Sequence, residues 1–133
     1  MAADEDLQSG REMRRRAQGG KSDQLGEALA ELDPTLLRWT DSFIFGDVWT
    51  RPGLEYEQRM LVAITALATQ GHSSQLRNYF HGALQAGIPT EAIKEALLML
   101  CVYAGFPVAL NALVLFRQVL ASEARRATPP EKP

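Results

Sequence analysis

The chain has 133 residues, of which 46% are hydrophobic and 23% are charged, and its formal net charge is -2. This length suits a single domain with one core, and the composition is that of an ordinary soluble globular protein. So small a net charge gives no general attraction to nucleic acid or to an anionic membrane surface. The one cysteine, Cys101, excludes an internal disulfide and a paired-thiol redox centre, which indicates a reducing compartment.

The sequence carries no recognisable signal for export or membrane insertion. Its first residues, MAADED, are acidic and lack the apolar core of a secretory signal. The longest apolar run, residues 96–110, is too short to span a bilayer and is interrupted by Gly105 and Pro107. The basic run over residues 11–16 includes Glu12 and no aromatic residue, which favours a solvated helix face over a nucleic-acid site. We therefore expect a cytoplasmic protein that binds neither membranes nor nucleic acid.

The first half of the chain predicts helices that begin at recognisable caps. Residues 1–9 are expected to be flexible, and Ser22 or Asp23 can cap a short helix. Asp33 followed by Pro34 is a stronger start signal, because the carboxylate caps a helix and proline fits its first position. The helix that follows has a stripe of residues at helical spacing: Leu36, Leu37, Thr40, Phe43 and Ile44.

A loop is predicted over residues 46–53, where two glycines and a proline accompany Trp49 and Arg51. Loops of this kind often carry functional sites. Further helices are predicted over residues 55–69, 73–87, 89–104 and 108–124.

The whole pattern predicts an all-α fold. No stretch shows sustained period-two alternation, so we expect a single-domain bundle of about six helices over residues 10–124. A flexible tail is expected over residues 125–133. The last three helices have little polar surface, so we expect their apolar patches to be subunit contacts.

Five short motifs follow one another along the chain. They are FGDVWTRPGL at 45–54, RMLVAI at 59–64, GALQAGI at 82–88, EAIKE at 91–95 and YAGFPVALNA at 103–112. Their order and spacing resemble the carboxymuconolactone decarboxylase family. The early GREMRRR at 10–16 is similar to the first helix of its decarboxylase branch, so the resemblance covers about residues 10–122.

The resemblance implies an all-α protomer that assembles into trimers or hexamers, with active sites near the subunit contacts. One branch, similar to the alkyl hydroperoxidases, uses a Cys-x-x-Cys pair, which is absent from HSSQLRNY at 72–79. The other branch decarboxylates a carboxylated muconolactone in aromatic-acid catabolism without metal or organic cofactor. The implied activity is therefore that of a cofactor-free lyase, acting on a small cyclic carboxylate or related carbonyl compound by general acid/base catalysis.

The sequence departs from the family pattern at three positions. Counted back from Gly87, the family histidine falls at Tyr79, and the carboxylate often found one turn earlier falls at Gln75. Met99 occupies a position that is commonly polar in the family. The nearby His81 is two positions from Tyr79, so on a helix it points to roughly the opposite side.

Loss of carbon dioxide from a lactone acid requires a fixed carboxylate, a place for the electrons and a proton donor. Arginine can hold a carboxylate through two parallel hydrogen bonds, which makes Arg51 and Arg77 candidates. Tyr79 or Tyr103 can donate the proton if a nearby charge lowers the phenol pKa, and His81 can donate near neutral pH.

The remaining candidates are binding residues. Gln75 can hydrogen-bond a carbonyl on which charge develops, and Trp49 and Phe106 can form an apolar wall that excludes water. Two separate histidines and no cluster of cysteine, histidine or carboxylate residues do not predict a metal site.

Each candidate also has a structural interpretation. Tyr79 can be a core aromatic residue, His81 a surface or interface residue, and Arg51 a tie between a loop and a helix end. A family member that lacks both the histidine and the cysteine pair can serve as a non-catalytic small-molecule-binding or scaffold oligomer. A peroxide-linked reductase that uses Cys101 alone is a weaker alternative, because a thiolate is disfavoured in the most apolar run of the chain.

Overall fold

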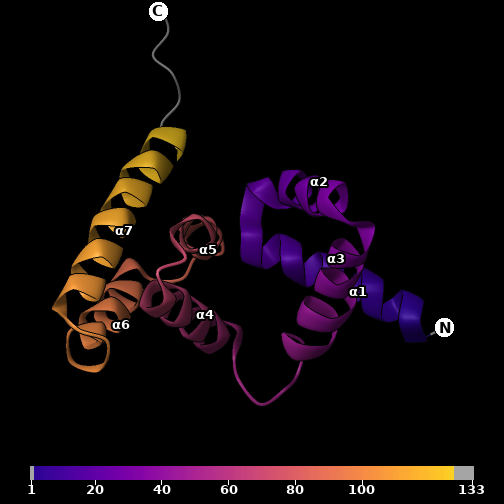
Figure 1. Ribbon diagram of the computed structural model, residues 1–133, viewed down its shortest axis with the longest axis horizontal. Coiled ribbons are helices and arrows are strands. Elements are labelled where there is room, and N and C mark those ends of the chain that lie inside the picture. The colour runs from indigo at the N-terminus through magenta and orange to yellow at the C-terminus, as the bar shows by residue number, and fades with distance from the viewer. Residues whose placement is uncertain (1, 128–133) are drawn as a thin grey trace, which may run out of the picture. The chain divides into compact units, whose positions relative to one another are not determined.

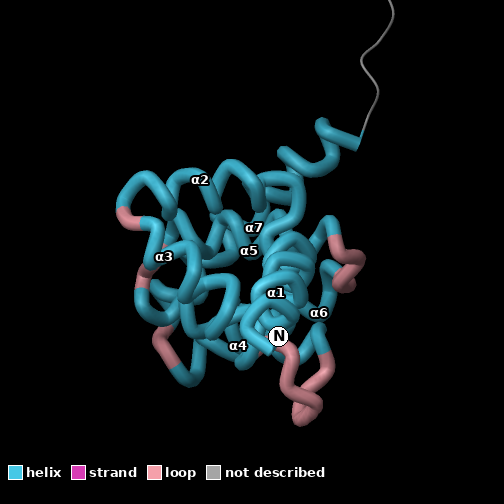
Figure 2. The backbone as a smooth tube through the Cα atoms, turned by 90° about the vertical axis from the view of Figure 1, so that its right-hand side faces the viewer, coloured by secondary structure: helices cyan, strands magenta, loops and turns pink. Residues whose placement is uncertain are grey.

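Helices joined by short loops make up the computed structural model, which describes residues 2–127 (Figure 1). Figure 2 shows no strand within that described range, so the predicted all-α fold is confirmed. In chain order the elements are α1 (Ala2–Gln18), the 3-10 turn η1 (Gly19–Lys21), α2 (Ser22–Leu32), α3 (Pro34–Trp39), the π-helix η2 (Thr40–Val48), α4 (Tyr56–Gln70), α5 (Ser73–Gln85), α6 (Thr90–Tyr103) and α7 (Phe106–Ala127). None of the helices within residues 2–127 has both the length and the apolar character needed to cross a bilayer.

Both ends of the described chain are more helical than the sequence predicts. Helix α1 begins at Ala2 and α7 continues to Ala127. Residues 2–9 and 125–127 are therefore helical where flexible segments were expected. The remainder of the expected tail, residues 128–133, lies outside the described residues.

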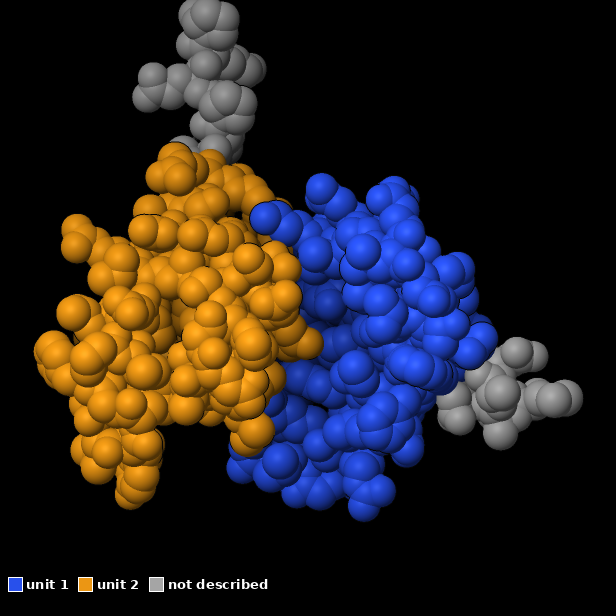
Figure 3. Space-filling view, in the orientation of Figure 1, with its two compact units in different colours: residues 1–60 blue, residues 61–133 orange. Residues whose placement is uncertain are grey.

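The chain divides into two compact units, whereas its length alone predicts one core. Unit 1 is Met1–Met60 and unit 2 is Leu61–Pro133, and Figure 3 colours them separately. Unit 1 contains α1 through η2, and unit 2 contains α5 through α7 with most of α4. Among the described residues, most of the buried apolar side chains belong to unit 2, which therefore has the larger core.

In unit 1, helix α1 packs along η2 around one buried ion pair. Arg14 Nε donates to Asp41 Oδ1 at 2.6 Å, and Arg14 Nη1 donates to the backbone carbonyl of Ser22 at 2.6 Å and to its hydroxyl at 3.0 Å. A Cβ atom on Gly10 would lie 1.6 Å from the Asp41 carbonyl oxygen, so only glycine permits this approach. The basic run is therefore not a uniformly solvated face, because Arg14 is buried within it.

The π-helix η2 changes which side chains face inward. Its buried residues are Asp41, Phe45 and Gly46, whereas Phe43, which belongs to the predicted stripe, is 59% exposed. A π-helix bonds each N–H to the carbonyl five residues back, so inward positions drift away from the α-helical spacing. The helix also extends to Val48, so the loop predicted over residues 46–53 begins later than expected.

The short-range signals for helix ends are mostly correct. The Asp33 carboxylate accepts from the Thr35 backbone N–H at 2.8 Å, as predicted for the cap of α3. Gly71 and Gly87, with φ of 75° and 86°, follow α4 and α5 in the left-handed conformation that glycine adopts after a helix. The predicted cap of α2 is wrong, because the Ser22 hydroxyl accepts from Arg14 instead of capping a backbone N–H.

In unit 2, helix α7 packs against both α5 and α6 (Figure 1). The ring centroids of Phe80 on α5 and Phe116 on α7 are 4.9 Å apart. The chain turns from α6 into α7 at Gly105, where the sequence predicts a break. Several apolar side chains of these two helices remain exposed, and we refer to them as the α6–α7 apolar face: Leu98, Met99, Val102, Tyr103, Phe106, Leu110 and Val114.

Candidate active site

An open groove of about 520 Å³ lies within unit 2, between the end of α4, the start of α5 and the middle of α7. Its apolar lining includes Leu67, Leu76, Val108 and Leu115, and its polar lining includes Thr69, Ser73, Asn111 and Gln118. Among the described residues that line it, Arg77 is the one that carries a charge. The size and the mostly uncharged walls are those of a site for a small molecule.

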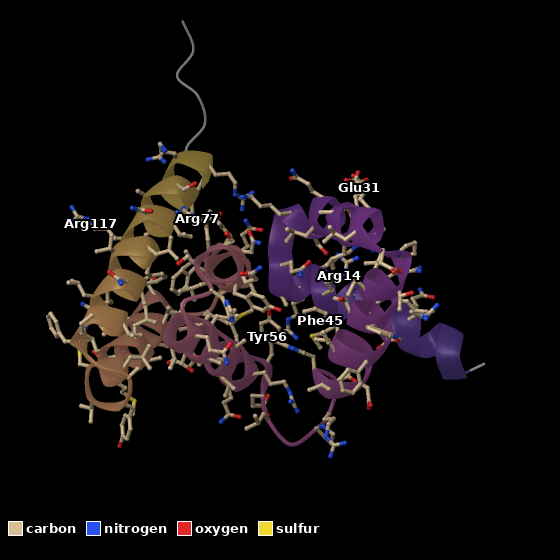
Figure 4. All side chains as sticks on the ribbon, in the orientation of Figure 1. Arg14, Glu31, Phe45, Tyr56, Arg77 and Arg117 are labelled. Carbon is tan, nitrogen blue, oxygen red and sulfur yellow. The ribbon has the colours of Figure 1, made fainter. Side chains whose placement is uncertain are left out.

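Arg77 crosses the groove from α5 to α7. Its Nη2 donates to Gln118 Oε1 at 3.2 Å. Figure 4 shows Arg77 on the side of α5 that faces α7, and Arg117 pointing from α7 away from α5. Because the partner is a neutral amide, the positive charge of Arg77 is not compensated there, and the first turn of α5 adds positive partial charge. The groove therefore favours an anionic ligand.

His81 lies one turn beyond Arg77 on α5 and is joined to α7 by a short hydrogen bond. Its Nδ1 is 2.6 Å from Oε2 of Glu123. That oxygen also accepts from Gln85 at 3.1 Å, and the other carboxylate oxygen accepts from Arg126 at 3.3 Å. His81 is buried, which differs from the surface or interface position considered for it.

The network around Glu123 fixes its charge. Burial acts to raise the pKa of this carboxyl, but the hydrogen bonds from His81, Gln85 and Arg126 outweigh burial and lower the pKa. An ionised carboxylate only accepts hydrogen bonds, so Nδ1 of His81 carries a proton. Glu123 is absent from the candidates drawn from the sequence, because its partner His81 is 42 residues away and no local pattern links them.

Tyr79 occupies a different kind of environment from the one that its proposed role requires. It is half-buried on α5, and burial raises the pKa of its phenol to about 12. Proton donation by Tyr79 would instead require a nearby charge that lowers this pKa. Tyr79 therefore keeps its proton at neutral pH and is suited to donate a hydrogen bond.

The other candidates of unit 2 are exposed. Gln75 lies near the start of α5. Tyr103 is 79% exposed and Phe106 is 64% exposed, and both belong to the α6–α7 apolar face. None of the three lines the groove.

Trp49 and Arg51 belong to unit 1. The Trp49 ring packs against Phe45 at 5.4 Å and Tyr56 at 6.0 Å between centroids. Arg51 is exposed, and its backbone carbonyl accepts from the Arg59 guanidinium, so its tie to α4 runs through the backbone. Of the eight predicted site residues, all of them within the described chain, Arg77 alone lines the groove.

Comparison with known proteins places these features in a family. Residues 34–118 match the sequence model of the carboxymuconolactone decarboxylase family. The chain is 30% identical over 93 residues to the 4-carboxymuconolactone decarboxylase of Acinetobacter baylyi. The aligned residues cover 70% of this chain and 69% of that protein. It is 32% identical over 119 residues to an uncharacterized 15.0 kDa protein of Paracoccus denitrificans. That alignment covers 88% of this chain and 89% of the Paracoccus protein.

A fungal protein is also similar. The chain is 32% identical over 76 residues to the nitrosuccinic acid decarboxylase npaB of Metarhizium robertsii. The aligned residues cover 57% of this chain and 53% of that protein. The family match includes every residue that lines the groove and also His81, and it ends before Glu123.

Proposed function

Because this chain belongs to the carboxymuconolactone decarboxylase family, we propose that it is a cofactor-free lyase that removes carbon dioxide from a small cyclic carboxylate or related carbonyl compound. The observation that carries the proposal is the groove in which Arg77 is the charged lining residue. Two relatives named as decarboxylases, one bacterial and one fungal, support the reaction class.

Binding in this proposal depends on Arg77. Its guanidinium holds the substrate carboxylate through two parallel hydrogen bonds, and Gln118 is displaced. As carbon dioxide leaves, the electrons of the broken C–C bond move onto the neighbouring carbonyl and form an enolate. The negative charge moves within the groove but is not lost, so the guanidinium stabilises it throughout. The amide of Asn111, which lines the groove, supplies a hydrogen bond to the enolate oxygen.

The enolate carbon then takes one proton to complete the reaction. His81 supplies it from Nε2, because Nδ1 is held by Glu123. Tyr79 keeps its proton in this proposal and does not supply it, because burial raises the pKa of its phenol to about 12. Tyr103 and Phe106 belong to the exposed α6–α7 apolar face. In this proposal they contribute to an active site only if another subunit covers that face.

We propose that the protein is a homo-oligomer, a trimer or a hexamer. The support is the α6–α7 apolar face, on which Val102 is 78% exposed and Tyr103 is 79% exposed. Apolar side chains gathered in this way on a small protein mark an interaction surface.

The direct test measures carbon dioxide release from 4-carboxymuconolactone by purified protein and by two arginine variants. Arg77→Gln is expected to lower kcat/KM roughly 10- to 100-fold, the range for loss of a hydrogen bond to a charged group. Arg117→Gln removes the same charge from the far side of α7 and is expected to retain activity. Equal activity of the two variants would place the reaction outside the groove, and no release by the unmodified protein would overturn this substrate.

A second function is favoured by the environment of Tyr79. This tyrosine stands at the family's histidine position with a phenol pKa raised to about 12, which suits a binding residue better than an acid. The alternative is a small-molecule-binding subunit without catalysis. In that case small carboxylates raise the melting temperature of the unmodified protein but not of Arg77→Gln, and no carbon dioxide is released.

A further inference from the structure

The two ring nitrogens of His81 have unequal surroundings. Nδ1 is fixed by Glu123 at 2.6 Å, whereas Nε2 has no hydrogen-bond partner within the described part of the chain. Among the described residues, no buried side-chain nitrogen or oxygen lacks a partner, so Nε2 is not sealed from solvent. One nitrogen is therefore held and the other is open for proton exchange.

The carboxylate that holds Nδ1 is itself held in place. Gln85 donates to the same oxygen as His81, and Arg126 donates to the other oxygen through two nitrogens at 3.3 Å. The side chain of Glu123 is 15% exposed and that of His81 is 9% exposed, so solvent competes little with these bonds. The imidazole is thereby confined to the form that is protonated at Nδ1 and to one ring orientation.

His81 lies on the same face of α5 as Arg77, the charged residue that lines the groove. His81 follows Arg77 by four residues on α5, a spacing that puts the two Cβ atoms about 5–6 Å apart. Both side chains meet α7, at Gln118 and Glu123 respectively. That separation matches a small molecule whose carboxylate contacts Arg77 and whose reacting carbon faces His81.

We propose that Glu123 is a positioning residue, which keeps one proton of His81 on Nδ1 so that Nε2 is the nitrogen that gains and gives up the proton used in the decarboxylation. The proposal rests on the proposed function. In the step itself, the N–H bond at Nε2 of the imidazolium breaks and a C–H bond forms at the enolate carbon. The neutral imidazole then takes a proton from water, which restores the starting state.

The first test is a spectroscopic one on the full chain. In ¹⁵N-labelled protein, the NMR shifts of the neutral His81 imidazole are expected to show protonation at Nδ1 only. In Glu123→Gln the amide can donate to Nδ1, so a population protonated at Nε2 is expected. A mixture of forms in the unmodified protein, at a pH where the ring is neutral, would overturn the proposal whether or not any variant folds.

The second test separates positioning from binding and from folding. Glu123→Gln is expected to lower kcat roughly 10- to 100-fold with KM nearly unchanged, because Arg77 still binds the substrate. His81→Gln is expected to lower kcat similarly, and the double variant no further. The matched control Glu95→Gln removes a carboxylate from an exposed position on α6 and is expected to behave as the unmodified protein.

The two proposals fail in different ways. If the unmodified protein releases no carbon dioxide from 4-carboxymuconolactone, the proposed function fails for this substrate, while the NMR result still reports the arrangement at His81. If release occurs and Glu123→Gln retains full kcat, the positioning role is wrong and the decarboxylase proposal stands.

Discussion

Arg14, Arg15 and Arg16 are consecutive in the sequence but make three different kinds of contact. Arg14 is buried against Asp41, Arg15 forms an exposed pair with Asp23 at 3.6 Å, and the Arg16 guanidinium lies 3.8 Å from the centre of the Tyr56 ring. Successive residues of an α-helix are rotated by about 100° around its axis, which separates the three side chains. A basic run on a helix is therefore not one surface, and its members need separate interpretation.

Tyr79 gives a prediction for alkaline pH. The folded-state pKa of about 12 exceeds the ordinary value of 10.0, so the folded protein holds this proton more tightly than the unfolded chain does. The resulting stability is complete below about pH 10 and is lost as pH rises towards 12. Absorbance titration is expected to show one tyrosine ionising near pH 12, and Tyr79→Phe is expected to remove that step. Tyr103→Phe is the control, and a late step that survives in Tyr79→Phe would contradict the assignment.

The candidate site was only partly predictable from single residues. Arg77 was predictable because carboxylate binding calls for a guanidinium, and it is the predicted residue that lines the groove. Glu123 was not, because its role depends on the packing of α5 against α7 and not on neighbours in sequence. The raised pKa of Tyr79 was also unpredictable, since burial depends on the tertiary structure.

Among the elements, α1 and η2 show where local signals stop being sufficient. The start of α3 is encoded locally by Asp33 and Pro34, and the sequence predicts it correctly. The π-helix has no such signal, and it directs Asp41 towards Arg14 on another helix. Helical spacing in the sequence does not reveal a contact of this kind between two helices.

Gly10 is predicted to be essential for the packing of these two elements. In Gly10→Ala the new methyl group would overlap the Asp41 carbonyl oxygen, so α1 and η2 must separate and the buried ion pair weakens. We expect a loss of about 3 kcal/mol in the free energy of unfolding, although alanine favours helices over glycine. Urea denaturation measures this loss. Gly53→Ala, at a position with nothing within 4 Å of the added carbon, is expected to change stability little. Equal stability of both variants would contradict the close approach.

At the scale of the whole molecule, the α6–α7 apolar face leads to a prediction about assembly. Val102 is 78% exposed within one chain, so Val102→Lys leaves the protomer's own core intact. If copies of the chain cover this face, the substitution buries a charge in the interface and dissociates the oligomer. Sedimentation velocity is expected to show a trimer or hexamer for the unmodified protein and a smaller species for the variant.

Two results bear on that prediction about assembly. Val62→Lys, at a 59% exposed valine on α4, is the matched substitution and is expected to keep the oligomer. An unmodified protein that sediments as a monomer would contradict the assembly. Circular dichroism of Val102→Lys should retain the helical signal, which separates dissociation from unfolding.

The division into two units has a consequence for optical studies of unfolding. Both tryptophans, Trp39 and Trp49, lie in unit 1, and unit 2 contains none within its sequence. Tryptophan fluorescence, excited selectively over tyrosine, therefore follows the unfolding of unit 1 alone, whereas far-ultraviolet circular dichroism follows the helices of both units. Coincident curves from the two probes mean that the units unfold as one cooperative system. Separated curves measure the stability of each unit within the intact chain.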